Sequence, residues 1–217
     1  MQSKGMARFA PLAGVLFLLL AIATALTSGD PPDADAPTNE IAEWWKDNDT
    51  KNAISAVLGV YAAGVLVWFA GALREAIARA EGPGSRLASV AFGGSVIVAT
   101  GLAVNSALQV TAAESAGDVP PEVTQAIHAI YDGMYFPLGL GFGLLLLASG
   151  VAAIRHGAFD RWLGWIAVVL GVLCFTPLGF IGFLGGIAWV AIAGIVLYRK
   201  KDPVGSGAAE SPLPPPV

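Results

Sequence analysis

The sequence is poor in charged residues. Only 13% of its 217 residues are Asp, Glu, Lys or Arg, whereas soluble globular chains carry about 25%. Hydrophobic residues make up 55% of the chain, and the mean hydropathy is +0.67. This composition is typical of a chain whose surroundings are mostly lipid. The net charge of −4 provides no basic surface for nucleic acid, so nucleic-acid binding is not expected.

Residues that usually carry chemistry are scarce as well. The single cysteine, Cys174, excludes an internal disulfide and any CxxC-type metal or haem-attachment site. The two histidines, His128 and His156, flank the same apolar segment about 42 Å apart by helical rise, so they cannot ligate one haem or one metal ion. No HExxH, GxSxG, P-loop or GxGxxG motif occurs. We therefore expect no enzymatic activity and no cofactor, and the sequence identifies no substrate.

Long apolar segments dominate the chain instead. A helix needs about 20 mainly apolar residues to cross roughly 30 Å of hydrocarbon. The last apolar stretch, 162–198, has 37 residues and a turn signal at Thr176-Pro177, so we divide it into two short spans. The sequence predicts an all-α, polytopic transmembrane helix bundle of six spans, at about 9–27, 53–73, 87–110, 127–154, 162–176 and 180–198.

The positions of the basic residues agree with this topology. With both termini in the cytoplasm, ten Lys and Arg residues fall on the inner side, and Lys46 and Lys51 fall outside. Residues 1–201 are therefore predicted to be one transmembrane domain of a bacterial inner (plasma) membrane protein, with an outer loop at 28–52. The Pro-rich segment 202–217 is predicted to be a disordered cytoplasmic tail.

The first span has two interpretations. Lys4 and Arg8 precede its apolar run, and Ala23-Thr24-Ala25 has the small-x-small form of a signal-peptidase site, which would leave five spans after cleavage. Because further spans follow and the apolar run continues to Leu26, we favour an uncleaved anchor.

The outer loop contains a short amphipathic pattern. Ile41, Trp44 and Trp45 fall at i, i+3 and i+4, on one face of a helix that Thr38 or Asn39 can cap. Tryptophan is enriched where the lipid headgroups begin. This face is predicted to anchor the helix on the outer membrane surface or, alternatively, to dock a partner or a lipid ligand.

Six polar residues within the apolar segments are the candidate binding residues, because a polar group in lipid is unfavourable. By helical rise they all belong to the outer third of the membrane, and Pro137 is expected to kink span four near Asp132. They are Tyr61, Asn105, Gln109, His128, Asp132 and Tyr135. Either they form a small polar cavity open to the outside, with Asp132 as its ligand-binding group, or Asp132 and His128 lie in the wet interface above the hydrocarbon.

Small residues are frequent in the predicted spans. Gly139 and Gly143 form one GxxxG pair, Gly182 and Gly186 form another, and Gly93-Gly94 lies in span three. Such residues allow helices to approach closely in lipid. We expect them to support tight packing within one bundle.

One loop resembles a known family. The segment 156–165, His-Gly-Ala-Phe-Asp-Arg-Trp-Leu-Gly-Trp, is similar to the G-x-[FL]-P-R-[WI]-L-G turn of bacterial membrane proteins described only as domains of unknown function. Asp160 stands where that turn has proline. Further short similarities to uncharacterised actinobacterial proteins lie at 40–49, 73–74, 80–82 and 91–94. The resemblance implies a six-helix bacterial inner-membrane fold and brings no activity or catalytic residue.

Two functions follow as expectations. The first is a non-enzymatic integral membrane protein, structural or accessory to a membrane partner or to a second copy of itself. The second is a small-solute transporter or sensor that uses an outward-facing polar cavity around Asp132.

Overall fold

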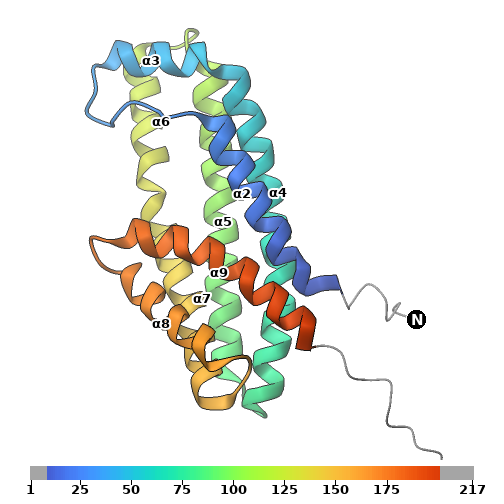
Figure 1. Ribbon diagram of the computed structural model, residues 1–217. Coiled ribbons are helices and arrows are strands. Elements are labelled where there is room, and N and C mark those ends of the chain that lie inside the picture. The colour runs from blue at the N-terminus through green and yellow to red at the C-terminus, as the bar shows by residue number, and fades with distance from the viewer. Residues whose placement is uncertain (1–8, 201–217) are drawn as a thin grey trace, which may run out of the picture.

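The computed structural model describes residues 9–200 (Figure 1). This part of the chain forms helices and contains no strands. Lys4, Arg8, Lys201 and the predicted tail 202–217 lie outside the described residues. The prediction of an all-α chain is confirmed. The elements are η1 (Ala10–Leu12), α2 (Ala13–Ser28), α3 (Thr38–Asp47), α4 (Asp49–Glu81), α5 (Arg86–Ser115), α6 (Pro121–Gly133), α7 (Tyr135–His156), α8 (Arg161–Leu173) and α9 (Gly179–Lys200).

Five helical segments of the described chain are long and apolar enough to cross a membrane. They are Ala10–Ser28, α4, α5, the continuous pair α6–α7, and α9. Helices of this length and composition are those of a multi-pass membrane protein. The two helices α6 and α7 meet at Met134, three residues before Pro137, where we expected a kink.

The prediction of six spans is not confirmed. Helix α8 has 13 residues and is about 20 Å long, which is too short to cross roughly 30 Å of hydrocarbon. It ends at Leu173 because the chain turns there: the Thr176 hydroxyl donates to the Leu173 carbonyl oxygen at 2.9 Å, and Pro177 cannot donate to a helix. The segment 162–176 is therefore a short apolar helix and a turn.

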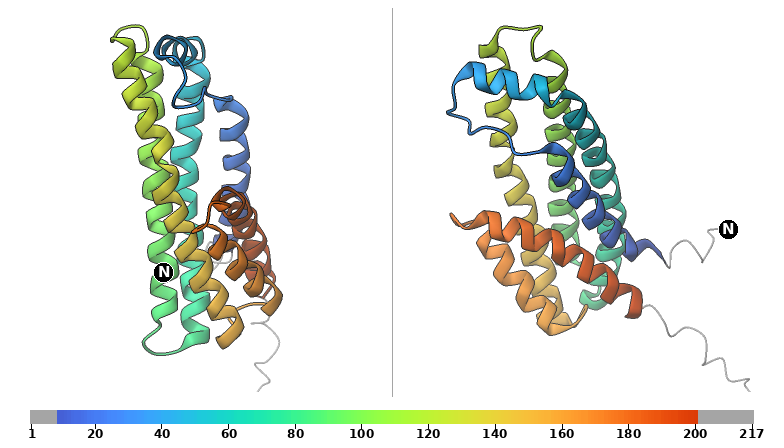
Figure 2. Two further views of the ribbon diagram at one scale, coloured as in Figure 1. Left: turned by 90° about the vertical axis from the view of Figure 1, so that its left-hand side faces the viewer. Right: turned by 45° about the horizontal axis from the view of Figure 1, so that its top comes forward.

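Helices α8 and α9 form a hairpin at one end of the bundle. Its turn lies about halfway along the molecule and does not reach the end where α3 lies (Figures 1 and 2). At the open side of the hairpin, Lys200 Nζ lies 2.8 Å from Asp160 Oδ1, and buried Trp189 donates from Nε1 to the Leu163 carbonyl oxygen at 3.0 Å. The two helices are thus tied together at their charged ends.

The frame of the bundle is made by α4, α5 and the α6–α7 pair, and α2 lies along α4. Helix α4 ends at Glu81. The next residue, Gly82, has φ of +83°, and Gly84 of the same turn has φ of +79°, values that glycine adopts without strain. The Glu81 carboxylate then accepts the free backbone N–H groups of Arg86, Leu87 and Ala88 at 3.0–3.3 Å and caps α5. The turn at Gly82-Pro83 therefore separates α4 from α5.

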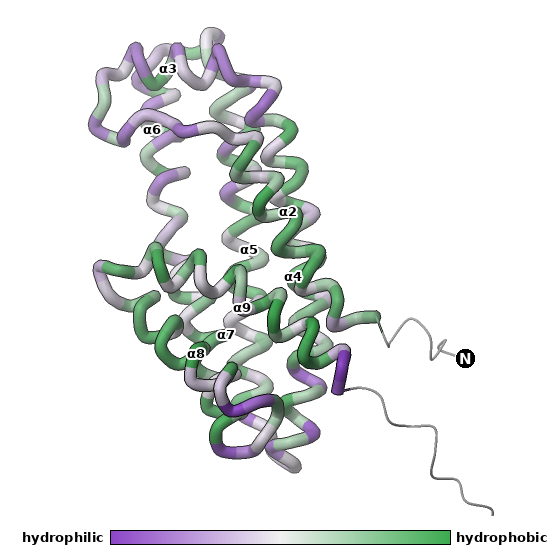
Figure 3. Tube along the Cα trace, in the orientation of Figure 1, coloured by the Kyte–Doolittle hydropathy of each residue, from purple (hydrophilic) through white to green (hydrophobic). Residues whose placement is uncertain are grey.

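Large apolar side chains cover the outside of the bundle as well as its inside. The core contains Phe69, Phe142 and Trp189, whereas Trp68 is 71% exposed and Phe136 is 80% exposed. Hydrophobic residues run along the length of the helices, and hydrophilic ones gather mainly at the two ends (Figure 3). An exposed apolar surface of this extent is expected to face lipid.

Glycine allows helices α5 and α7 to approach each other closely. A Cβ atom on Gly94 of α5 would lie 2.6 Å from the Leu145 backbone nitrogen, and one on Gly141 of α7 would lie 2.8 Å from the Val98 backbone nitrogen. Both predicted GxxxG pairs also lie against other segments of the same chain; for example, a Cβ atom on Gly182 would lie 2.7 Å from the Cys174 backbone nitrogen. Gly93, by contrast, has no other atom within 4 Å of its Cβ position.

Adjacent glycines supply a matched test of this contact. Gly94→Ala should lower the free energy of unfolding by about 1–3 kcal/mol, because the α5 and α7 backbones have to separate. Gly93→Ala should leave it unchanged or raise it slightly, since alanine is the better helix former. Thermal unfolding of both variants in one detergent, followed by circular dichroism, measures the difference. Equal melting temperatures would contradict the close contact.

Candidate functional site at the acidic end

The end of the molecule that carries α3 is rich in carboxylates, and we call it the acidic end. The loop 29–37 leads from α2 into α3, and α3 lies across the tops of α4, α5 and α6 (Figures 1 and 2). Basic residues at this end are Lys46 and Lys51. The acidic residues are Asp30, Asp33, Asp35, Glu40, Glu43, Asp47, Asp49, Glu114, Asp118 and Glu122.

Helix α3 buries the apolar face that its sequence pattern predicts. Ile41 and Trp45 are both 0% exposed and pack on Ala112 and Ala113 of α5. Trp44 is half-buried beside them. The single apolar face is confirmed, but two of its three residues contact the chain's own bundle and have no surface left for lipid or a partner.

A hydrogen-bonded histidine holds α3 in place. Trp45 Nε1 lies 3.3 Å from His128 Nδ1, and His128 Nε2 lies 3.1 Å from the Pro32 carbonyl oxygen. An indole N–H can only donate, so Nδ1 is the acceptor, and a neutral ring then carries its proton on Nε2 and donates it to Pro32. The Tyr131 ring meets Trp45 edge-on at 5.5 Å. We call Pro32, Trp45, His128 and Tyr131 the aromatic lock, because they join the loop, α3 and α6.

A second group of buried polar side chains joins α2, α4 and α5. Gln109 Nε2 donates to Asn52 Oδ1 at 2.9 Å and to Ser55 Oγ at 3.2 Å. Ser55 Oγ donates in turn to the Thr24 carbonyl oxygen at 3.1 Å, and Asn52 Nδ2 donates to the Asn48 carbonyl oxygen at 3.0 Å. We call Asn52, Ser55 and Gln109 the amide cluster. All three side chains are buried.

The structure distributes the six predicted binding residues over several places. Gln109 belongs to the amide cluster and His128 to the aromatic lock, and the Asn105 side chain lies near Tyr131 of the lock. Asp132 is exposed, and Tyr61 is 63% exposed on α4. The Tyr135 hydroxyl is buried near Gly179, under the α8–α9 turn, without a hydrogen-bond partner among the described residues.

Sequence reasoning did not identify Asn52, Ser55, Tyr131 or Pro32. Asn52 and Ser55 are three residues apart at the start of the apolar run of α4, and this spacing on one helix face was a usable signal. Nothing in the sequence pairs Pro32 with His128, because 96 positions separate them.

A groove lies on the surface of the acidic end, beside the aromatic lock. Its volume is about 510 Å³, and it is walled by the loop 29–37 and the first turns of α3. The carboxylates of Asp30, Asp33, Asp35 and Glu40 line it, together with the indole of Trp44. We call this hollow the acidic groove. Within residues 9–200, no group of three or more His, Cys, Asp and Glu side chains is placed to hold a metal ion.

Comparison with protein-family models, with curated proteins and with solved structures found no match for this chain.

The aromatic lock predicts unequal effects of two neighbouring tryptophans. Trp45→Phe removes the donor to His128 and leaves a buried imidazole nitrogen without a partner, which should reduce local stability by about 1–3 kcal/mol. Trp44→Phe removes no bond within the lock. Hydrogen exchange of the α3 amides in lipid nanodiscs should be faster for the first variant and nearly unchanged for the second. Equal protection in both variants would show that the lock does not hold α3.

The amide cluster predicts non-additive substitutions. Gln109→Leu or Asn52→Leu alone should lower the free energy of unfolding by about 1–3 kcal/mol, because each leaves buried polar atoms unpaired. The loss of unfolding free energy in the double variant should be smaller than the sum of the two single losses, by about 0.5–3 kcal/mol. Unfolding by sodium dodecyl sulfate in mixed micelles measures all three values. Strict additivity would mean that the two side chains are not coupled.

Proposed function

We propose that this chain is a non-enzymatic integral membrane protein, accessory to a membrane partner, and that the acidic groove receives a positively charged segment of that partner. The observation that carries the proposal is a groove of about 510 Å³ lined by four carboxylates and held in a defined shape. Ligand-binding grooves and pockets typically have volumes of roughly 300–1,000 Å³, so this groove is large enough for a few side chains of a partner.

The shape of the groove is held by contacts on both of its walls. On the loop side, the Pro32 carbonyl is bound to His128, and three prolines at 31, 32 and 37 restrict the backbone. On the helix side, buried Ile41 and Trp45 attach α3 to the bundle, and the Thr38 hydroxyl donates to Gln125 Oε1 at 2.9 Å. A preorganised groove loses little conformational freedom on binding, which favours affinity.

The chemistry of the lining selects a cationic occupant. Four carboxylates in one hollow repel anions and attract Lys or Arg side chains. The Trp44 indole adds an aromatic surface on which a guanidinium or ammonium group can stack. A basic segment of a membrane protein that emerges at the same side of the bilayer meets both requirements.

The orientation in the membrane is part of this proposal. The end opposite to α3 carries Arg86, Arg155, Arg161 and Lys200 among its described residues. Basic residues are concentrated on the cytoplasmic side of bacterial inner-membrane proteins. We therefore place the acidic groove outside and the basic end in the cytoplasm.

The alternative of a small-solute transporter or sensor around Asp132 has weaker support. Both nitrogens of His128 and the amide nitrogen of Gln109 already serve intramolecular hydrogen bonds that join helices. A solute would have to displace these bonds to use the same groups. We retain the alternative as one outcome of the experiment below.

Site-specific photo-crosslinking from position 36, where an alanine lines the groove, in membranes of the cells that make the protein, tests the accessory function. We expect one major crosslinked protein, with a net positive crosslinked peptide. The triple variant Asp33→Asn, Asp35→Asn, Glu40→Gln should reduce the yield of this crosslinked product about tenfold or more, because charge-assisted contacts in the groove are lost.

The control removes the same charge elsewhere on the acidic end. Glu114→Gln, Asp118→Asn, Glu122→Gln neutralises three exposed carboxylates that do not line the groove. Equal losses with both triple variants would attribute the contact to unspecific surface charge and overturn the proposal. Native mass spectra with a small bound mass that disappears in Asp132→Asn, without any protein crosslink, would favour the transporter or sensor.

A further inference from the structure

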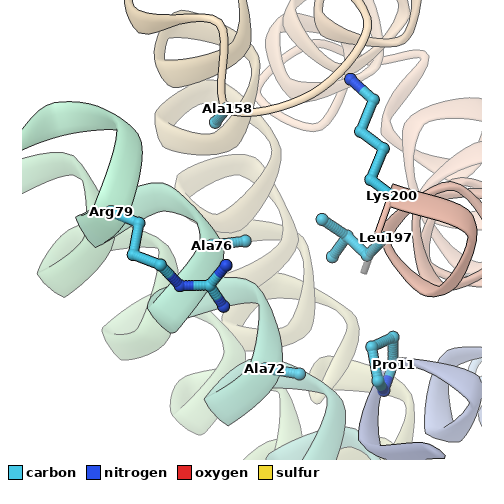
Figure 4. A pocket seen from close by; sticks show the side chains of 7 residues that line it. All are labelled: Pro11, Ala72, Ala76, Arg79, Ala158, Leu197 and Lys200. Atoms are coloured by element: carbon cyan, nitrogen blue, oxygen red, sulfur yellow. The ribbon is translucent and has the colours of Figure 1, made fainter. Parts of the chain in front are cut away.

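A small pocket at the basic end combines two cationic side chains with an apolar floor. It lies between η1, α4, the loop 157–160 and α9, and has a volume of about 80 Å³ (Figure 4). Arg79 stands on one side and Lys200 on the other, and the residues between them are small or apolar. These residues are Pro11, Ala72, Ala76, Ala158 and Leu197.

The hollow exists because α4 carries alanine where its neighbours come close. Val65, Trp68, Ala72, Ala76 and Arg79 are spaced by three or four residues and share one face of α4. Ala72 and Ala76 leave room beneath Arg79 that a larger side chain would fill. The Phe9 and Tyr198 rings stack at 6.1 Å and join the residue before η1 to the end of α9.

Both cations are held by ion pairs that are easily exchanged. Arg79 Nη2 lies 3.3 Å from Glu75 Oε1, and Lys200 Nζ lies 2.8 Å from Asp160 Oδ1. The Glu75 side chain is 62% exposed and that of Asp160 is 44% exposed. Ion pairs this accessible to water contribute little stability, so a better anion can recruit the two cations without a large loss.

The same face of α4 leads from this pocket to an apolar groove. On the other side of η1, Val65 and Trp68 line a hollow of about 440 Å³ together with Phe9, Leu12 and Leu16. Arg79 and Val65 are about 21 Å apart by helical rise, so a charged site and an apolar site follow one another along the membrane-crossing direction. A phospholipid has the same order of charged and apolar parts.

We propose that the pocket between Arg79 and Lys200 binds the phosphate of an anionic phospholipid headgroup in the leaflet at the basic end. A guanidinium fork and an ammonium group are the side chains that bind phosphate best. Basic pockets between transmembrane helices on the cytoplasmic side are suited to such headgroups. This inference concerns the end of the molecule opposite to the acidic groove and does not depend on the proposed partner.

Native mass spectrometry of the delipidated full chain, titrated with dioleoyl phosphatidylglycerol or dioleoyl phosphatidylcholine, tests the proposal. The wild type should bind the anionic lipid in preference. The double variant Arg79→Gln, Lys200→Gln should weaken that binding about tenfold or more, since two charge-assisted contacts are lost. The matched variant Arg86→Gln, Arg155→Gln removes the same charge from exposed positions outside the pocket. It should change the affinity for phosphatidylglycerol less than about twofold.

Two further measurements decide between shape, charge and the source of the phosphate. Ala76→Leu fills the hollow without changing its charge and should also weaken phosphatidylglycerol binding; thermal unfolding verifies that this variant is folded.

If inorganic phosphate fails to displace the lipid, the result supports a lipid headgroup as the occupant of the pocket. Displacement by inorganic phosphate, with the same dependence on Arg79 and Lys200, would make the occupant a soluble phosphate and overturn the lipid assignment. Equal weakening by both double variants, or no preference between the two lipids, would overturn the pocket itself.

Discussion

A polar group between helices in lipid cannot hydrogen-bond to water, so it needs a hydrogen-bond partner within the chain. The amide cluster follows from this constraint. Gln109 of α5 reaches Asn52 and Ser55 of α4, and Ser55 reaches a carbonyl of α2, so three helices share one set of hydrogen bonds. The position of α2 along α4, and with it the start of the loop 29–37, depends on these bonds.

In the aromatic lock at the acidic end, buried polar groups again find their partners within the chain. His128 accepts from α3 on one side and donates to the loop on the other, so one imidazole positions both walls of the acidic groove. The carboxylates that give the groove its charge take no part in the lock. The side chains that hold this short segment in place are therefore different from those that we propose to bind the partner, so each set can be changed without the other.

The two ends of the molecule have opposite charge and different proposed ligands. At the acidic end, a groove with carboxylates and Trp44 suits a cationic protein segment. At the basic end, Arg79 and Lys200 flank a pocket that suits a phosphate. Between them, the close contact of Gly94 with Gly141 packs α5 against α7 without a polar group.

Much of the fold could be predicted from local sequence. The apolar runs, the stop at Gly82-Pro83 and the one-sided pattern of Ile41, Trp44 and Trp45 all correspond to observed elements. These features depend on neighbours within a few positions, and helical periodicity expresses them directly. The short length of α8 was not predicted. An apolar run of 37 residues is long enough for two helices, but its composition does not show that the first of them is too short to cross the membrane.

The sequence by itself determined that the chain is helical, apolar on its outside and acidic around α3. Only the tertiary structure decided which polar groups meet. Gln109 and Asn52 are 57 positions apart, Trp45 and His128 are 83 apart, and Arg79 and Lys200 come from helices at distant parts of the chain. Periodicity assigns each of these residues to a face of its own helix, but the partner on the opposite face is set by how the helices pack. For that reason the six residues predicted to share one cavity are found in separate clusters and on the surface.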